Sequence, residues 1–283
     1  MRIHHLNCGT CCPLGGHLFD GTSHGLLRGH VVCHCLLIET DSAGLVLVDT
    51  GFGTRDVASR SRIAPFFRFL NQPQFRAEET AAAQIRALGH DPADVRHILV
   101  THLDFDHAGG LEDFPNARVH LLAREKEVAD ARNGGAFVGT RRYRPGQWDE
   151  VTDWALYPAG RGEKWMGFDA VRDLDGLPPE ILLVPMAGHT WGHSAVAIDT
   201  GEGWLLHAGD AYFFRGEVGR PTRECPPGMR FYQWMMEVDR TARLSNQERL
   251  RQLSLERTDV RIFCAHDVSE IRQFTRVPPA ATL

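Results

Sequence analysis

The sequence predicts an α/β protein in which two β-sheets pack face to face with helices outside. Apolar, β-branched runs of strand length occur in two groups along the chain, and helical patterns accompany each group. A chain of 283 residues is large enough to bury such a core without disulfide or metal staples. Because no repeat, low-complexity tract or linker divides the chain, we expect a single domain over residues 1–283.

The first group of elements lies between residues 30 and 132. Apolar runs predict strands in HVVCHCLLIET (30–40), GLVLVDTG (44–51), VRHILVTH (95–102) and ARVHLLA (117–123). AEETAAAQIRALGH (77–90) predicts a helix, because Ala, Glu, Gln and Leu favour helices and Gly89 is a common stop signal. REKEVADAR (124–132) predicts a second helix.

The second group follows an irregular stretch. Residues 133–178, rich in Gly, Arg, Trp and Pro, predict a long surface excursion, and residues near 52–76 predict a shorter insertion that shapes a pocket. Further strands are predicted in EILLVPMAGH (180–189), SAVAIDT (194–200), GWLLHAGDA (203–211) and VRIFCAHD (260–267). A charged helix is predicted over residues 235–257.

Composition excludes several classes of protein. The net charge of −5 argues against a nucleic-acid binder, which usually carries a basic excess. No stretch approaches the roughly 18 apolar residues of a membrane span, and MRIHHLNCGTCCPLGG (1–16) has no apolar segment of the signal-peptide kind. We therefore expect a cytoplasmic protein with a small-molecule substrate and with neither a membrane nor a nucleic acid as partner.

The seven cysteines do not form a recognisable framework. Their number is odd and the expected compartment is reducing, which argues against disulfides. CGTCC (8–12) contains one C-x-x-C, but a zinc ribbon needs a second such pair. We therefore expect Cys8, Cys11 and Cys12 to be small buried or partly buried thiols.

THLDFDHAGG (101–110) crowds two histidines and two aspartates into a few positions at the end of a predicted strand. In an extended strand end, residues two apart point the same way, so His102 and Asp104 can converge on one metal ion. The chain must then turn, which lets Asp106 and His107 face a second ion. The small residues that follow allow the backbone to pass close to such a centre.

Three more polar residues follow apolar strands in the same manner: His189 in MAGHTWGHS, Asp210 in LLHAGDA and His266 in IFCAHD. A lone histidine at a strand end is usually only a polar terminus. Four such clusters in one chain indicate instead that the side chains gather at one edge of the sheets.

The ordered motifs LVDTG, THLDFDHAGG, GHTWGHS, HAGD and CAHD resemble those of the metallo-β-lactamase fold hydrolases, over about residues 30–267. The resemblance implies an αββα sandwich of two mixed β-sheets with a dinuclear metal centre at one sheet edge. It implies one ion on His102, Asp104 and His189, a second ion on Asp106, His107 and His266, and Asp210 bridging both. Asp49 would lie beneath and orient a ligand. Three neighbouring residues are interpreted as structural supports rather than ligands: His193, His207 and Asp267.

Asp104 departs from the family motif, which is H-x-H-x-D-H where this chain has H-x-D-x-D-H. The flavodiiron oxidoreductases, which are related, carry a glutamate there, so a carboxylate is compatible with metal binding. With Asp104, Asp106, Asp210 and a hydroxide, two divalent ions would form a neutral centre, where the usual ligands leave one positive charge. The resemblance implies zinc, and the harder donor set also admits iron or manganese.

The resemblance implies hydrolysis by a metal-bridging hydroxide, and no G-x-S-x-G motif offers a competing nucleophile. Asp106 would take the proton of the attacking water. Tyr212 would polarise the substrate carbonyl, although it follows Asp210 by two residues where lactonases of this fold have three. The alternative interpretation of Tyr212 is an aromatic residue of the pocket wall or the core.

Aromatic residues predict the substrate pocket. The candidates are Phe66, Phe67, Trp191 and Phe213, with filling of a second small core as the alternative interpretation. They favour a moderately apolar substrate with an ester bond, either a lactone such as an N-acyl-homoserine lactone or an aryl or alkyl ester. The apolar segment 61–75 is alternatively a homodimer contact.

Three other functions stay open. The first is another hydrolase of this fold, acting on thioesters, phosphoesters or β-lactams. The second is a diiron oxidoreductase, which the carboxylate at Asp104 favours and the lack of a flavin domain disfavours. The third is a binding module that has lost its catalytic centre, although all seven ligand positions carry suitable donors.

Overall fold

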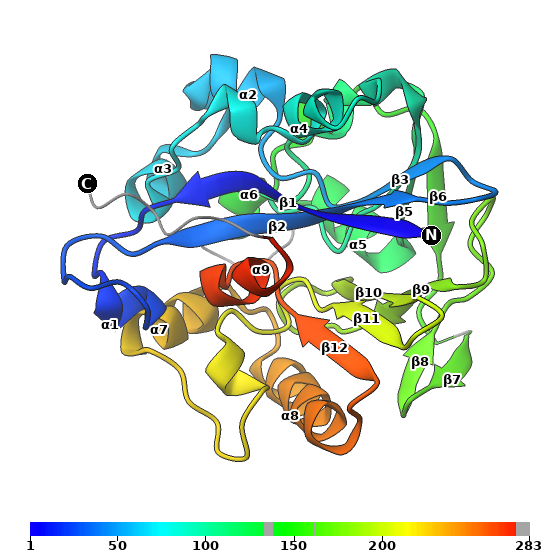
Figure 1. The fold of residues 1–283 in the computed structure, drawn as a ribbon. Coiled ribbons are helices and arrows are strands. Elements are labelled where there is room, and N and C mark those ends of the chain that lie inside the picture. Colours follow the sequence, from blue (N-terminus) through cyan, green and yellow to red (C-terminus); the bar gives the residue numbers. More distant parts are fainter. Residues whose placement is uncertain (133–137, 161, 276–283) are drawn as a thin grey trace.

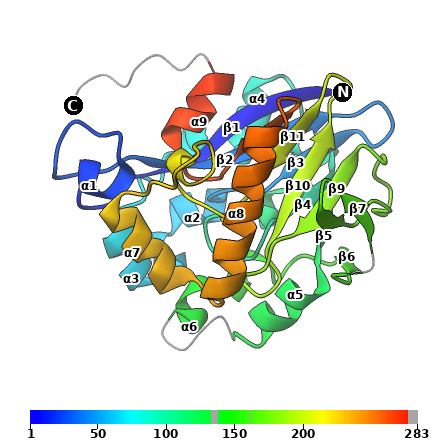
Figure 2. The same ribbon diagram turned by 90° about the horizontal axis from the view of Figure 1, so that it is seen from below.

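The computed structural model describes residues 1–132, 138–160 and 162–275, and it has the predicted fold class. Two β-sheets pack against each other, and helices cover their outer faces (Figure 1). The same layers are seen from below in Figure 2, where α8 crosses the outer face of the smaller sheet. The prediction of two mixed sheets between helices is therefore confirmed.

The larger sheet has six strands, in the order β1-β2-β3-β4-β5-β6. Their bounds are β1 Arg2–Cys11, β2 Val31–Glu39, β3 Leu45–Val48, β4 Val95–Leu99, β5 Arg118–Leu122 and β6 Trp154–Tyr157. The first three strands pair antiparallel, and β3 to β6 pair parallel. A helix separates most of the parallel strands along the chain, as such connections require.

The smaller sheet has the order β12-β11-β10-β9, and a separate hairpin is formed by β7 and β8. The bounds are β7 Glu163–Trp165, β8 Phe168–Ala170, β9 Ile181–Pro185, β10 Ser194–Asp199, β11 Trp204–His207 and β12 Val260–Phe263. β10 runs antiparallel to β9 and to β11, whereas β11 and β12 are parallel. The carboxyl ends of β9, β11 and β12 therefore lie at one edge of the sheet.

Nine α-helices lie within the described ranges. They are α1 His17–Asp20, α2 Thr54–Ala58, α3 Pro65–Asn71, α4 Ala81–Ala87, α5 Ala123–Asp130, α6 Gly139–Arg142, α7 Pro227–Met236, α8 Arg240–Glu256 and α9 Val268–Phe274. None of the helices in these ranges is both long and apolar enough to cross a lipid bilayer.

The period-two alternation of the strands sorts their side chains into separate core layers. Leu36 and Ile38 of β2 face the smaller sheet and pack with Leu183 of β9, whereas Leu37 packs in the cluster that contains α4. On the other side, Leu182 packs in the cluster that contains α8. Because successive strand residues point to opposite faces, one apolar strand contributes to two layers of the sandwich.

The prediction for residues 133–178 is wrong in part. Residues 154–157 form β6 at the edge of the larger sheet, and residues 163–170 contain the β7–β8 hairpin. Tyr143 and Trp148 are buried rather than on the surface. The high Gly and Pro content made this stretch resemble a loop, although it contributes to the core. Residues 133–137 and 161 lie outside the described part of the chain.

Two further differences concern element boundaries. The helix predicted over residues 235–257 begins at Arg240, because Asp239 caps it by accepting a hydrogen bond from the Ala242 amide. A separate helix, α7, precedes it. The strand β1 was not predicted, since His, Asn, Gly and Thr interrupt its apolar pattern.

Candidate metal centre

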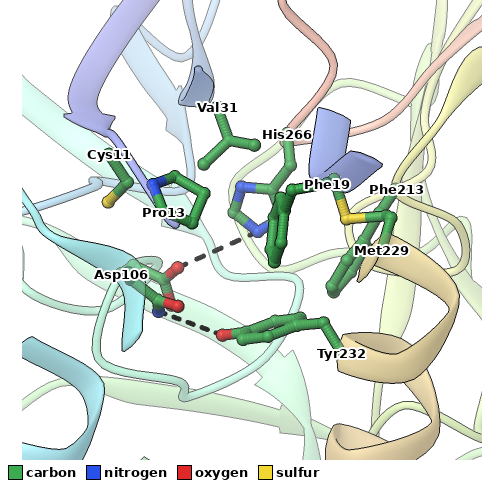
Figure 3. Close-up of a pocket in the computed structure, with 10 residues that line it drawn as sticks. Cys11, Pro13, Phe19, Val31, Asp106, Phe213, Met229, Tyr232 and His266 are labelled. Carbon is green, nitrogen blue, oxygen red and sulfur yellow. Dashed lines mark hydrogen bonds and ion pairs between the residues drawn. The ribbon is translucent and has the colours of Figure 1, made fainter. Parts of the chain in front are cut away.

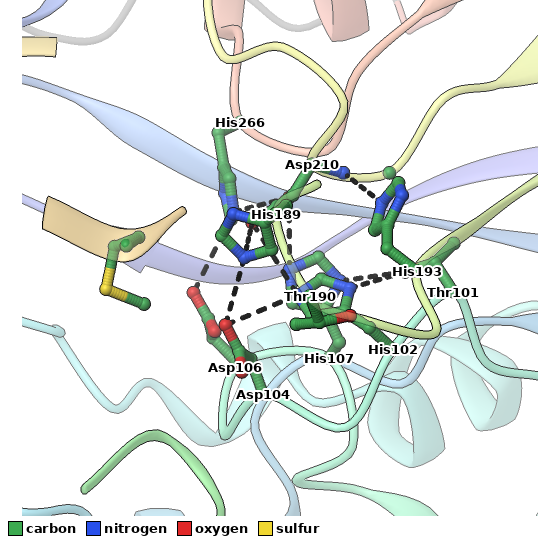
Figure 4. Close-up of polar contacts among 12 residues, drawn as sticks. Thr101, His102, Asp104, Asp106, His107, His189, Thr190, His193, Asp210 and His266 are labelled. Carbon is green, nitrogen blue, oxygen red and sulfur yellow. Dashed lines mark hydrogen bonds and ion pairs between the residues drawn. The ribbon is translucent and has the colours of Figure 1, made fainter. Parts of the chain in front are cut away.

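The structure brings all seven predicted ligands together at the strand ends. Four of them lie on the loop after β4, and the others follow β9, β11 and β12. Each is at most 9% exposed, and the side chains turn toward a common point in Figure 4. The seven are His102, Asp104, Asp106, His107, His189, Asp210 and His266.

In one part of the centre, ligand atoms of an aspartate and two histidines face one another at short distances. The Asp210 Oδ1 atom lies 3.3 Å from His107 Nε2 and 3.1 Å from His266 Nε2. Among the described residues, His102 Nε2, His107 Nε2 and Asp210 Oδ1 are buried without a hydrogen-bond partner. Buried polar atoms are seldom left this way, so these atoms fit a bound cation.

The other ring nitrogen of each of these histidines is already fixed. His107 Nδ1 contacts Asp49 Oδ2 at 2.8 Å, and His266 Nδ1 lies 2.7 Å from the Val32 carbonyl oxygen. A ring that donates from Nδ1 keeps its Nε2 lone pair for a metal ion. Asp49 also accepts hydrogen bonds from the Thr101 amide and hydroxyl, so it lies where the resemblance places an orienting group.

Asp104 and His189 have a different environment, because the side chain of Arg142 lies against both. Arg142 Nε and Nη2 each donate to one oxygen of Asp104 at 2.6 Å. Nη2 also lies 2.8 Å from His189 Nε2. The Arg142 side chain is fully buried. Sequence reasoning missed this residue, since it lies in the supposed surface excursion and far along the chain from its partners.

A second residue that sequence reasoning missed is Glu125 of α5. Its carboxylate accepts hydrogen bonds from the amides of Leu103 and Gly192 and from the hydroxyls of Thr190 and Tyr143. Leu103 belongs to the loop that carries Asp104, and Thr190 and Gly192 belong to the loop that carries His189. Glu125 therefore fixes those two loops relative to each other, although it contacts no predicted ligand.

The three residues interpreted as supports contact the backbone around the centre. His193 Nε2 accepts a hydrogen bond from the Asp210 amide at 2.9 Å. His207 Nε2 lies 2.6 Å from the His34 carbonyl oxygen, and Asp267 caps α9. None of these side chains belongs to the group of converging donor atoms.

Electrostatics keep two of the carboxylates anionic. Burial alone would raise the pKa of Asp104, but the Arg142 guanidinium holds it well below its usual range. Burial also opposes ionisation of Asp210, whose pKa His266 nonetheless holds well below the usual value. Burial lowers the pKa of His102 to about 4, which leaves its ring neutral. Anionic carboxylates and neutral imidazoles are the forms that bind metal ions. Burial alone would lower the pKa of His107, but Asp210 and Asp49 hold it well above the usual value, so His107 would lose a proton as an ion binds.

A pocket opens directly onto this centre (Figure 3). The free space between its walls is about 350 Å³ when the open solvent at its mouth is included, and the wall is largely apolar. The lining residues are Cys11, Pro13, Phe19, Val31, Asn71, Asp106, Phe213, Met229, Tyr232 and His266. Asp106 and His266 thus belong to both the pocket and the centre.

Of the four predicted pocket residues, one lines the pocket and the other three do not. Phe213 lines the pocket and contacts the rings of His189 and His266. Phe67 is fully buried against Phe105 behind the pocket, and Phe66 packs beside it. Trp191 is 40% exposed and lies outside the lining. For Phe66 and Phe67, the alternative interpretation as a small core is the better description.

The structure contradicts the predicted catalytic role of Tyr212. Its hydroxyl donates to Glu270 at 2.9 Å, and its ring is fully buried among residues of the smaller sheet and α8. It cannot reach a substrate in the pocket from there. Tyr232 of α7, which sequence reasoning missed, instead lines the pocket together with Asp106, and its hydroxyl accepts a hydrogen bond from Asn71 (Figure 3). No local spacing signal marks Tyr232, because a helix remote in sequence delivers it.

The cysteines carry no disulfide among the described residues. Cys8 and Cys11 are buried as expected, and Cys12 is partly exposed. Cys33 of β2 offers a sulfur that lies within 4.8 Å of donor atoms of Asp106 and His266. A thiol therefore borders the centre on the side of the pocket, which the sequence did not indicate.

Comparison with known proteins gives concordant results. The family model described as "Metallo-beta-lactamase superfamily" matches residues 28–266. A probable metallo-hydrolase of Mycobacterium tuberculosis is 41% identical over 268 residues, covering 94% of this chain and 80% of the relative. An N-acyl homoserine lactonase of Bacillus cereus is 24% identical over 238 residues, covering 83% of this chain and 81% of the lactonase.

A solved structure of an N-acyl homoserine lactone hydrolase, with the product N-hexanoyl-L-homoserine at its catalytic metal centre, superposes with a TM-score of 0.68. It is 21% identical and covers 96% of this chain and 95% of its own. At this identity, the likeness establishes a shared fold.

Proposed function

This chain belongs to the metallo-beta-lactamase superfamily, and from that membership we propose that it is a metal-dependent hydrolase of small ester substrates. Lactones of the N-acyl-homoserine type are the first candidate class, and aryl or alkyl esters are the second. The observation that carries the proposal is an apolar pocket lined by Asp106 and His266, which belong to a centre whose other buried donor atoms include several without a hydrogen-bond partner.

The residues of the centre suit this chemistry. A divalent ion held there would lower the pKa of a coordinated water and polarise the oxygen that gains charge as an ester is attacked. Asp106 lies at the pocket wall, and burial raises its pKa above the usual value, which suits it to take a proton from the attacking water. The resemblance predicts two ions that share Asp210, and the number and identity of the ions stay predictions.

Tyr232 is suited to the carbonyl-polarising role first assigned to Tyr212. Its oxygen accepts a hydrogen bond from Asn71 Nδ2 at 3.0 Å, which leaves its own hydrogen to be donated. A substrate carbonyl in the pocket would receive that hydrogen bond and lose electron density at its carbon. Burial, together with the charge of Asp106, raises the pKa of Tyr232 well above its usual value, so the hydroxyl stays protonated.

The pocket wall favours a neutral substrate with an apolar arm. Phe19, Val31, Phe213 and Met229 offer an acyl chain a continuous apolar surface. None of the described lining residues is lysine or arginine, which disfavours phosphoesters. The relatives named as N-acyl homoserine lactonases support the lactone class. Thioesters and β-lactams remain alternatives within the same fold.

The diiron oxidoreductase alternative depended on a carboxylate ligand at position 104. Because Arg142 contacts both oxygens of Asp104, this observation no longer favours it. We therefore propose hydrolysis alone.

A substrate screen tests the proposal. Protein stripped of metal and reloaded separately with zinc, manganese or iron would be assayed on lactones, aryl esters, thioesters, phosphoesters and β-lactams. We expect turnover of lactones or esters that disappears on chelation and returns on reloading. A folded, metal-loaded protein that hydrolyses none of these substrates would refute the proposal.

A matched pair of variants tests the assignment of the pocket. Phe213→Ala should raise KM for lactones with long acyl chains more than for those with short ones, because it shortens the apolar wall. Trp191→Ala removes an aromatic ring outside the lining, so it should leave KM unchanged for lactones with long and with short acyl chains. Equal effects of the two variants would exclude this pocket as the acyl-binding site.

A further inference from the structure

Arg142 uses its whole hydrogen-bonding capacity inside the centre. Nε and Nη2 donate to the two oxygens of Asp104, and Nη2 also lies 2.8 Å from His189 Nε2. Nη1 donates to the carbonyl oxygens of Met236 at 2.8 Å and His189 at 3.3 Å. A guanidinium group has five N–H bonds, so each of them has a partner here. The side chain is therefore held in one position and not merely adjacent to the site.

These contacts use the same electron pairs that a metal ion would need. An imidazole nitrogen has one lone pair, so His189 Nε2 cannot bind an ion while it accepts from Arg142 or, in the other tautomer, while it donates to Asp104 Oδ2 at 3.1 Å. Both oxygens of Asp104 already face a positive charge. A second divalent ion at this point would also lie against a cation that does not lose its proton.

The rest of the centre shows the opposite situation. His102 Nε2, His107 Nε2 and Asp210 Oδ1 are buried without a hydrogen-bond partner among the described residues, and they lie within 4.8 Å of one another. Donor atoms about 2.1 Å from one tetrahedral ion lie about 3.4 Å apart. The distances from Asp210 Oδ1 to His107 and His266, 3.3 and 3.1 Å, match that spacing. The distances from Asp104 Oδ2 to His102 and His189, 3.4 and 3.1 Å, match it too, so the two parts differ in the contacts of Arg142 and not in spacing.

We propose that the guanidinium of Arg142 takes the place of one of the two metal ions that the resemblance implies. The centre then binds a single ion, held by His107, Asp210 and His266 with His102 beside them, next to a permanent organic cation that balances Asp104. This inference rests on the proposed function, because it concerns how the same centre is loaded. It also explains how an aspartate is accommodated at position 104, where the family motif has a neutral histidine.

The first test measures metal content rather than activity. The full-length protein would be dialysed against excess zinc or manganese, and the bound ions counted by elemental analysis. We expect one ion per chain in the wild type. Arg142→Met frees Asp104 and His189 and should raise the count toward two. The double variant Asp104→His, Arg142→Met removes both charges of the pair and restores the family motif, so it should also bind two.

Arg243→Met is the matched control. Arg243 is also buried and pairs with a carboxylate, Glu237, but it contacts none of the predicted ligands. Its removal should leave the count at one. A rise to two in this control as well would show that the count reflects general loosening of the protein, and would overturn the assignment to Arg142.

Electron paramagnetic resonance of the manganese-loaded protein gives an independent measurement. An isolated Mn²⁺ spectrum in the wild type, and an exchange-coupled spectrum in the double variant, are expected. Two ions or a coupled spectrum in the wild type would overturn this inference while leaving the proposed hydrolase intact. A count of one in both Arg142 variants would overturn it too. If Arg142→Met fails to fold, the metal counts of the wild type and the double variant decide whether the inference holds. No bound ion in the wild type would instead overturn the proposed function.

Discussion

The two parts of the metal centre are built from the same residue types, yet they differ in what balances their charge. Asp104 and His189 are paired with a buried arginine, whereas His107, His266 and Asp210 face one another without a hydrogen-bond donor between them. Both parts lie at strand ends and are buried. The difference teaches that donor residues alone do not define a metal site. What matters equally is which other side chains reach their lone pairs.

The supports of the two parts differ as well. Asp49 contacts His107 directly and thereby aims a donor atom at the centre. Glu125 contacts no predicted ligand, and it holds the loops of Asp104 and His189 through backbone amides and hydroxyls. Asp49 thus orients a predicted ligand in the part that contains His107, His266 and Asp210, which we call the open part. Glu125 instead fixes the positions of the loops in the part that contains Arg142.

The largest effect is expected from Asp210→Asn, which removes the carboxylate that faces His107 and His266. Losing a single donor that stabilises an oxyanion lowers the rate about 100- to 1000-fold. Asp210→Asn removes the whole contribution of the ion, so the rate of ester hydrolysis should fall more than about a thousandfold. Metal retained after dialysis should drop to background. Asp199→Asn at the end of β10 is the control, and it should keep the wild-type rate of hydrolysis and the wild-type metal content. Full metal content in Asp210→Asn would contradict the assignment.

Asp104→Asn should act on stability instead. It leaves the Arg142 guanidinium buried without its counter-charge, and breaking a buried ion pair in this way costs about 3–5 kcal/mol. Urea unfolding would measure this cost. Asp153→Asn, which breaks the exposed pair with Arg118, should cost at most about 1 kcal/mol. If Asp104→Asn lost its metal as completely as Asp210→Asn, the distinction between the two parts would be wrong.

Tyr232→Phe tests which tyrosine donates a hydrogen bond to the substrate carbonyl. Removing one donor to the substrate carbonyl should lower kcat about a hundredfold with metal content unchanged. Tyr212→Phe removes a hydroxyl that contacts only Glu270 in the core, so it should leave kcat unchanged and cost about 1 kcal/mol of stability. The reverse pattern of kcat values would restore the catalytic role to Tyr212.

The smallest effect is expected from Asp49→Asn. Loss of a carboxylate that orients a metal-binding histidine weakens metal affinity about 10- to 100-fold. Competition with a chromophoric chelator would measure it. Glu125→Gln is the corresponding change at the other part, and it should lower stability while leaving the affinity almost unchanged. Equal losses of affinity in the two variants would show that both supports serve the same ligands.

Much of this molecule follows from local sequence pattern. Continuous apolar runs predicted the strands, and their ends predicted where His102, His189, Asp210 and His266 would gather. These predictions succeed because a buried strand must be apolar along its length. The polar residue that ends such a strand must then lie at the sheet edge, whatever the rest of the chain does.

Other features depend on the packing of segments that are distant along the chain. No spacing rule connects Arg142 to Asp104, or Tyr232 to Asp106, because α6 and α7 reach the centre from separate parts of the chain. The direction of Tyr212 is also a tertiary property, since the turn after β11 decides whether its side chain enters the pocket or the core. Sequence determined which donor atoms assemble. Packing alone decided which of them a protein cation neutralises, because that depends on side chains meeting in space.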